Sequence, residues 1–260
     1  MIVRADDLQA AQQMTEWDAS WRIMMLTDSP YQSMCGKGER GAYTIKLSRH
    51  KSNWRMRIGD FIGYAQAENI NALVLLSQEE WDETERFYRG HAFNEPFLRE
   101  DEPEVLIHST PFANWTKIKR DGCLKSWNRV KQEMETQEEK PIGHLLGDPE
   151  DFRDYIMFGT GERCEIVVSS KEAGRLVDDA DEAYHSGARM YFDARKMAAD
   201  GLLIRDGTHL KVKHGLPLQP YMIWAATWEN LGLDSPISTP KRFSHTADSM
   251  FEENFHRSAK

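Results

Sequence analysis

The chain has 260 residues, of which 40% are hydrophobic, and a formal net charge of −9 at pH 7. This length suits one large domain or two modest ones, and the negative charge argues against a protein that coats nucleic acid non-specifically. No stretch of the sequence reaches the roughly 20 apolar residues that cross a bilayer, and residues 1–13 turn polar too early for a signal peptide. We therefore expect a soluble, cytoplasmic protein.

The three cysteines, Cys35, Cys123 and Cys164, are odd in number and far apart in the sequence. They form no C-x-x-C pair, which disfavours both a disulfide framework and a structural zinc site. We expect reduced, mostly buried thiols and no bound metal.

The first part of the chain alternates predicted strands with predicted helices. Strands are expected at residues 20–27, 42–48 and 71–77, and a helix at 54–69. Ser77 and Glu80 form a capping box, which predicts a second helix through about Tyr88. Residues 1–95 are thus expected to form a small α/β domain of unknown role, followed by an acidic, proline-containing linker at 93–103.

The second part of the chain begins with a predicted strand, EVLIHST (104–110), and a helix from Asn114 that ends at Gly122. A charged insertion or exposed helix follows at residues 131–140, and Asp148-Pro149 is typical of a helix start. The remaining expected elements are strands at 164–170 and 188–194, a hairpin at 202–213 that turns at Asp206-Gly207, and a mobile polar tail at 238–260.

Single polar residues give weak functional signals. His108 ends an apolar strand, a place where histidine is often an ordinary core residue, and no G-x-S-x-G elbow surrounds Ser109. His209 and His214 lie five residues apart, a spacing that does not put both on one strand face, so a metal site there is not expected. Spacing alone indicates a soluble α+β protein with a polar cleft.

Residues 104–126, EVLIHSTPFANWTKIKRDGCLKS, resemble the opening motif of the RNA 2′-phosphotransferases within the ADP-ribosyltransferase superfamily. That motif is a strand ending in His-Gly-Thr, a short helix and an Ile-x-x-x-Gly-Leu turn. His108 and Thr110 stand at the strand end, and Ser109 replaces the middle glycine. The turn residues follow in rough register as Ile118, Gly122 and Leu124.

A second segment, residues 188–222, is similar to the closing motif of the same family. The matching positions are Asp193, Ala194, Asp200, Gly201 and Arg205. His144-Leu145 resembles the family's second histidine motif, and Arg129 the arginine before it. The sequence departs from the family in two ways: the charged insertion separates Arg129 from His144, and the hairpin lacks the family's Ser-x-Asn-Gly.

The resemblance implies an α+β fold in which the small N-terminal α/β unit is followed, at residues 103–237, by an ADP-ribosyltransferase-like domain with a split β-sheet. It implies NAD as cofactor, with His108, Ser109 and Thr110 around its ribose and Tyr155 stacked on nicotinamide. Arg129, His144 and Arg205 would be catalytic, the arginines as clamps for a phosphate. Ordinary roles stay open for these side chains: a core position for Tyr155 and a surface ion pair for each arginine.

The function implied by the resemblance is an NAD-dependent transferase, most like RNA 2′-phosphotransferase, with RNA or another nucleic-acid end as acceptor. The alternative is a non-catalytic module on the same fold that binds NAD, ADP-ribose or a nucleic-acid end, because fold alone does not fix function.

Overall fold

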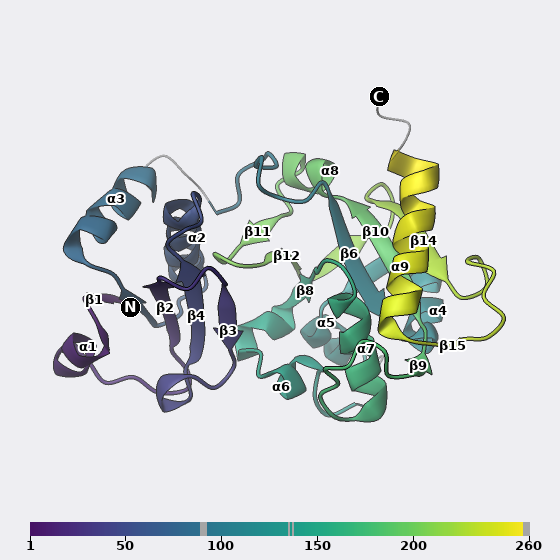
Figure 1. The fold of residues 1–260 in the computed structure, drawn as a ribbon, viewed down its shortest axis with the longest axis horizontal. Helices are drawn as coiled ribbons and strands as arrows, with labels where there is room; N and C mark the ends of the chain where they lie inside the picture. Colours follow the sequence, from purple (N-terminus) through teal and green to yellow (C-terminus); the bar gives the residue numbers. More distant parts are fainter. Residues whose placement is uncertain (89–92, 135, 137, 257–260) are drawn as a thin grey trace. The chain divides into compact units, whose positions relative to one another are not determined.

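The structure, a computed structural model, describes residues 1–88, 93–134, 136 and 138–256. The chain is a mixed α+β protein, in which a mixed, mostly parallel sheet with helices is followed by several small antiparallel sheets (Figure 1). The predicted α+β class is therefore confirmed. The chain divides into two compact units: unit 1 (Met1–Glu95, Leu146–Arg153 and Leu203–Lys211) and unit 2 (Pro96–Leu145, Asp154–Leu202 and Val212–Lys260).

The sheet of unit 1 has the strand order β1-β5-β2-β4-β3. Its strands are β1 (Ile2–Ala5), β5 (Ala72–Leu75), β2 (Arg22–Thr27), β4 (Tyr43–Ser48) and β3 (Ser33–Cys35). The first four in this order are parallel, and β3 pairs with β4 in the antiparallel direction. The predicted strands at 20–27, 42–48 and 71–77 correspond to β2, β4 and β5 and are confirmed.

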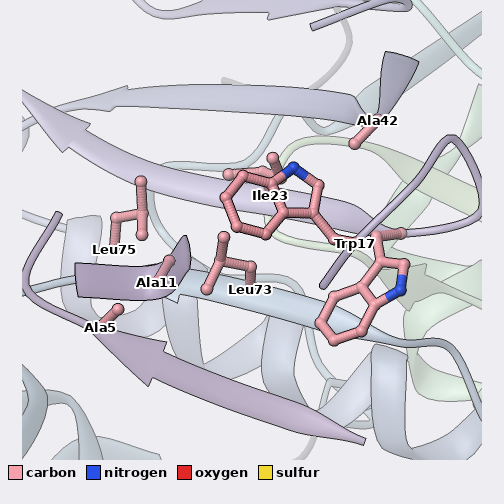
Figure 2. Packing of buried hydrophobic residues seen from close by; sticks show 8 residues of the cluster. Ala5, Ala11, Trp17, Ile23, Ala42, Leu73 and Leu75 are labelled. Carbon is pink, nitrogen blue, oxygen red and sulfur yellow. The ribbon is translucent and has the colours of Figure 1, made fainter. Parts of the chain in front are cut away.

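Helices cover both faces of this sheet. Helix α1 (Leu8–Met14) packs its buried Ala11 on the face that carries Ile23 and Leu73, in the apolar cluster of Figure 2. Met24 points to the opposite face, because successive side chains alternate along a strand. Helix α2 (Trp54–Ala67) lies there: a Cβ at Gly207 would be 3.0 Å from Met24 Cε and 3.1 Å from Phe61 Cβ of α2.

Helix α3 (Gln78–Tyr88) packs against α2 and begins at the predicted capping box. The Ser77 hydroxyl accepts a hydrogen bond from the Glu80 amide at 3.2 Å, and the Glu80 carboxylate accepts one from the Ser77 amide at 2.9 Å. Two donors of the first helical turn are thereby satisfied. The prediction of this helix and of its start is confirmed.

Two segments from later in the chain complete unit 1. One contains the 3₁₀-helix η2 (Glu150–Asp154) except for its last residue, and the other contains β11 (Ile204–Arg205) and the start of β12 (Leu210–Lys213). The strands β11 and β12 form the predicted hairpin, in which Gly207 has a φ of +91°.

A buried ionic network holds these two segments in unit 1. Lys211 is 0% exposed; its Nζ donates to Asp206 at 2.7 Å and lies 3.7 Å from the centroid of the Tyr64 ring. The Tyr64 hydroxyl in turn donates to Asp151 at 2.6 Å, and Arg22 forms an ion pair with the same carboxylate. Residues far apart in sequence are therefore joined by charge-assisted hydrogen bonds.

The main sheet of unit 2 is antiparallel, with the order β14-β10-β6 (Figure 1). Its strands are β14 (Met222–Thr227), β10 (Ala188–Asp193) and β6 (Val105–Thr110). Smaller antiparallel pairs join β13 (Gly215–Pro217) to β7 (Cys123–Lys125) and β15 (Ile237–Ser238) to β9 (Tyr184–His185). The strand β8 (Tyr155–Met157) leads into Gly159, which forms a bridge to Ile107 of β6.

The helices of unit 2 are α4 (Phe112–Asp121), α5 (Trp127–Gln132), α6 (Gly143–Leu146), α7 (Arg163–Ala173), α8 (Ala194–Ala199) and α9 (Pro240–Phe251), followed by a π-helical turn, Glu252–His256. The helix α4 ends at Gly122, whose φ of 64° confirms the predicted left-handed cap. No helix within the described ranges is long and apolar enough to cross a membrane.

The structure differs from the sequence prediction at residues 164–170. A strand was expected there, but the segment lies within helix α7. Glu165, Val168 and Ser169 are buried, a spacing of three and four residues that suits one face of a helix. The contacts of this face outweigh the β-propensity of the valine-rich sequence.

The predicted tail at 238–260 also differs, because Pro240–Phe251 form α9. Thr239 caps this helix, and Phe243, Ala247 and Phe251 recur every fourth residue on the face that packs into the core of unit 2. The last four residues, 257–260, lie outside the described part of the chain, as do residues 135 and 137 of the predicted insertion.

The predicted helix start at Asp148 differs as well: the regular structure begins at Glu150, and the Asp148 carboxylate forms no hydrogen bond among the described residues. Burial raises the pKa of Asp148 to about 6 from an ordinary value of 3.8, although the charges of His209 and Lys211 oppose this shift. The ionised carboxylate is therefore incompletely compensated in the folded protein.

This imbalance predicts a pH-dependent gain of stability for Asp148→Asn. Between about pH 4 and 6 the folded state binds more protons at Asp148 than the unfolded state does. The ionised Asp148 carboxylate therefore does not destabilise the fold below this pH window, and its destabilising effect is complete above it. The full shift corresponds to about 3 kcal/mol, which partial exposure reduces to about 1–2 kcal/mol. Denaturant unfolding at pH 7.5 should show this gain, and at pH 4 it should have vanished.

The exposed Asp178→Asn serves as the control, and its stability difference should not change with pH in this way. An Asp148→Asn variant less stable than the unmodified protein at pH 7.5 would contradict the prediction.

Candidate functional site

Alternation along β6 separates the residues of the His-Ser-Thr sequence. His108 and Thr110 lie on one face of the strand and Ser109 on the other, since side chains of a strand point alternately to opposite sides. The hydrogen bonds agree: His108 bonds to Met157 of β8, whereas Ser109 bonds to Glu165 of α7. The sequence analysis predicted that these three residues form one cofactor-binding group. In the structure their side chains lie in two different environments.

His108 is held in one tautomer. Its Nδ1 lies 3.0 Å from the carbonyl oxygen of Met157, and because a carbonyl only accepts, Nδ1 must carry the proton. The ring also meets Phe158 edge-on, with 6.2 Å between the centroids. Burial lowers the pKa of His108 below its usual 6.5, so the ring is neutral at pH 7.

The other ring nitrogen, Nε2, therefore presents a lone pair. This atom has no hydrogen-bond partner among the described residues. It is also not one of the side-chain atoms that are both buried and without a hydrogen-bond partner. His108 can accept a hydrogen bond from a hydroxyl group outside the protein.

Thr110 adds a hydroxyl on the same face as His108. It is 6% exposed, and its side chain forms no hydrogen bond within the described residues. Its backbone is closely covered, because a Cβ at Gly187 would lie 1.8 Å from the Thr110 carbonyl oxygen. The hydroxyl is not among the side-chain atoms that are buried without a partner, so water or a ligand can complete its hydrogen bonds.

Ser109 belongs to a buried network on the opposite face. Glu165 is fully buried and accepts hydrogen bonds from Ser109, from the Tyr184 hydroxyl at 2.7 Å and from Arg189 at 3.3 Å. Arg189, also fully buried, reaches Asp248 of α9 at 2.9 Å. Burial raises the pKa of Glu165, and the Arg189 charge opposes this. The role that these contacts give to Ser109 is structural.

Tyr155, the residue expected to stack on nicotinamide, lies in β8 and is 4% exposed. The Lys213 ammonium lies 5.6 Å from its ring centroid. This environment suits the core position that the sequence left open for it.

The residues expected to be catalytic belong to three different elements, and each has contacts of its own. Arg129 of α5 donates from Nε to Glu133 at 2.8 Å, and His144 is exposed on α6, with its Nε2 3.0 Å from the Lys140 ammonium. No hydrogen bond or ring contact within the described residues joins either of them to His108. Arg205 belongs to unit 1, where it is 2% exposed and donates to the Glu95 carbonyl oxygen at 3.4 Å.

Sequence reasoning missed the residues that organise this site, namely Met157, Glu165 and Arg189. Arg189 offered a signal, because a charged residue stood at an inward position of the predicted strand 188–194. Met157 acts through its backbone carbonyl and Glu165 lay in a segment predicted as a strand, so neither could be found from residue type alone.

The described residues contain no group of three or more His, Cys, Asp or Glu side chains that could hold a metal ion. Cys123 and Cys164 are free thiols. Burial raises the pKa of Cys164 to about 12, which keeps it protonated and unreactive.

No family model, curated protein or solved structure matches the chain. The resemblance to RNA 2′-phosphotransferases therefore stands on its motif residues, and the candidate site stands on the local geometry of His108 and Thr110.

The buried network predicts that Ser109→Ala lowers the free energy of unfolding by about 1.5–3 kcal/mol, because a charge-assisted hydrogen bond to Glu165 is lost. Chemical denaturation measures the change. Ser249→Ala, at an exposed position of α9, is the matched control and should have almost no effect. A Ser109→Ala variant as stable as the unmodified protein would show that Glu165 does not need this donor.

Proposed function

We propose that the chain is an NAD-dependent transferase of the ADP-ribosyltransferase superfamily, most like RNA 2′-phosphotransferase. One observation carries the proposal: at the end of β6, His108 is fixed as a neutral acceptor beside the uncompleted hydroxyl of Thr110. Residues two apart on one strand face are about 7 Å apart, a span that a ribose with its vicinal hydroxyls can bridge.

The residues present fit a ribose in their hydrogen-bonding capacity. His108 Nε2 accepts from one hydroxyl group, and the Thr110 hydroxyl both donates and accepts. When bound, NAD would supply an ADP-ribosyl group for transfer. The neutral imidazole orients the sugar and does not repel the positive charge that develops on a ribose whose glycosidic bond is breaking.

The acceptor in this proposal is a 2′-phosphate of RNA or another nucleic-acid end. Arg129 is the part of the predicted clamp that stays accessible, with a side chain 40% exposed. Its guanidinium is engaged by Glu133, so an incoming phosphate must compete with that carboxylate.

A second candidate is a non-catalytic module that binds NAD, ADP-ribose or a nucleic-acid end. It is favoured by the burial of Arg205, whose hydrogen bonds to unit 1 occupy a residue expected to grip phosphate. It is also favoured by His144, which is paired with Lys140 on an exposed helix.

We expect the purified protein to release nicotinamide from NAD in the presence of 2′-phosphorylated RNA, and His108→Ala to reduce the rate about 100-fold or more. The matched control is His185→Ala, an exposed histidine of β9 paired with Glu172, which should leave the rate unchanged. NMR of the released nicotinamide gives the rate, and calorimetric titration with NAD gives the affinity.

The outcomes separate the two candidates. Binding of NAD that is lost in His108→Ala, without any nicotinamide release, would support the binding module and overturn the transferase. Neither binding nor release would overturn both.

The pH dependence gives an independent test of the transferase. Because the pKa of His108 lies below 6.5 and only the neutral ring accepts a hydrogen bond at Nε2, the rate should fall on the acid side only below pH 6.5. A half-maximal rate above pH 6.5 on that side would assign the titration to another group.

A further inference from the structure

The carboxyl ends of the parallel strands of unit 1 meet at one cleft of about 490 Å³. Asp6 and Asp7 follow β1, Ser77 follows β5, Arg49 follows β4, and Met25 lies near the end of β2. Each parallel strand thus delivers a lining residue. A volume of this size is typical of sites for small organic molecules.

The chain topology explains why a cleft opens here. From the end of β1 the chain turns into α1, on the sheet face that carries Ile23. From the end of the neighbouring β5 it turns into α3, which packs on α2 across the opposite face. Adjacent strands whose connections diverge to opposite faces leave a crevice outside their carboxyl ends, the usual ligand position in open α/β sheets.

The charges of the lining disfavour a phosphate group. Asp6, Asp7 and Glu80 contribute negative charge, and the one lining cation, Arg49, is engaged by Glu80 at 2.7 Å and by Asp28 at 3.1 Å. The first turn of α3 is no anion site either, since Glu80 itself occupies the Ser77 amide. No glycine-rich turn that could cradle a phosphate follows β1, where the sequence reads Asp6-Asp7-Leu8.

The same lining suits hydroxyl groups above an apolar body. Carboxylates accept hydrogen bonds from hydroxyls. The Asp6 carboxylate forms an ion pair with Arg4 through Oδ1, but its side chain is 65% exposed, so a ligand hydroxyl can still reach it. Leu8, Leu26 and Leu75 provide the apolar surface of the cleft. A lining that combines a few polar groups with aliphatic side chains is typical of sites for small neutral molecules.

We propose that this cleft binds a small, hydroxyl-rich molecule without phosphate, of the size and polarity of a nucleoside. The proposal is independent of the NAD site in unit 2, because every lining residue belongs to unit 1. It gives the N-terminal part of the chain a ligand-binding role.

The test uses the full chain with adenosine as the probe and adenosine monophosphate as its charged counterpart. Calorimetric titration should give a dissociation constant of about 10 μM to 1 mM for adenosine, and binding of the monophosphate at least about tenfold weaker. Amide NMR shifts on adding adenosine should concentrate at residues 6–9, 25–26, 49 and 75–80.

Variants connect the binding to the cleft. Asp6→Asn keeps the shape of the side chain and should weaken adenosine binding about three- to tenfold, whereas Glu39→Gln, an exposed acid of unit 1 outside the cleft, should have no effect. His108→Ala should also leave it unchanged, which separates this cleft from the proposed NAD site. The proposal is overturned if adenosine fails to bind at about 5 mM, if the monophosphate binds equally well, or if Asp6→Asn changes nothing.

Discussion

The buried guanidinium of Arg189 is the constraint on which unit 2 depends. An ion removed from water loses several kcal/mol of hydration, so it is tolerated only where countercharges and hydrogen-bond acceptors surround it. Here they come from Glu165 on α7 and Asp248 on α9, two helices more than 80 residues apart at these positions. Because both carboxylates pair with the Arg189 guanidinium, α7 and α9 lie on the same face of the β14-β10-β6 sheet. His108 and Thr110, on the other face of β6, stay outside the network.

Unit 1 uses the same principle with a different cation. Burial alone would raise the pKa of Asp206, but the Lys211 ammonium and His209 hold it well below 3.8, so the pair stays ionised inside the fold. The Arg22–Asp151 pair spans 129 residues of sequence and brings the segment 146–153 to the first residue of β2. Tyr43, the first residue of β4, lies directly opposite Arg22 in the sheet. Long-range ion pairs thus fill the amino edge of the parallel sheet, and the carboxyl edge is left open as a cleft.

Elements fixed by neighbouring residues could be predicted from the sequence, and those fixed by distant partners could not. The capping box at Ser77 and the left-handed Gly122 depend on atoms within a few residues, and both predictions were confirmed. Helix α7 was taken for a strand because its valine-rich sequence has β-propensity. The contacts of its buried face, such as that of Glu165 with Arg189, 24 residues away, cannot be seen in the local sequence. The candidate site shows the same division. His108 was found from its motif, whereas its tautomer depends on the Met157 carbonyl, which no residue pattern encodes.

The distribution of satisfied polar groups separates structure from function in this protein. The Ser109 hydroxyl donates a hydrogen bond to the buried Glu165 carboxylate. Since these groups already have partners inside the fold, a ligand that contacted them would gain little binding energy. On the opposite face of the same strand, the His108 Nε2 lone pair and the Thr110 hydroxyl have no protein partner among the described residues, and neither atom is one of those buried without a partner. Adjacent residues of one motif therefore have different physical roles: the first and third are open to hydroxyl groups of a ligand, and the second fixes the strand from which they project.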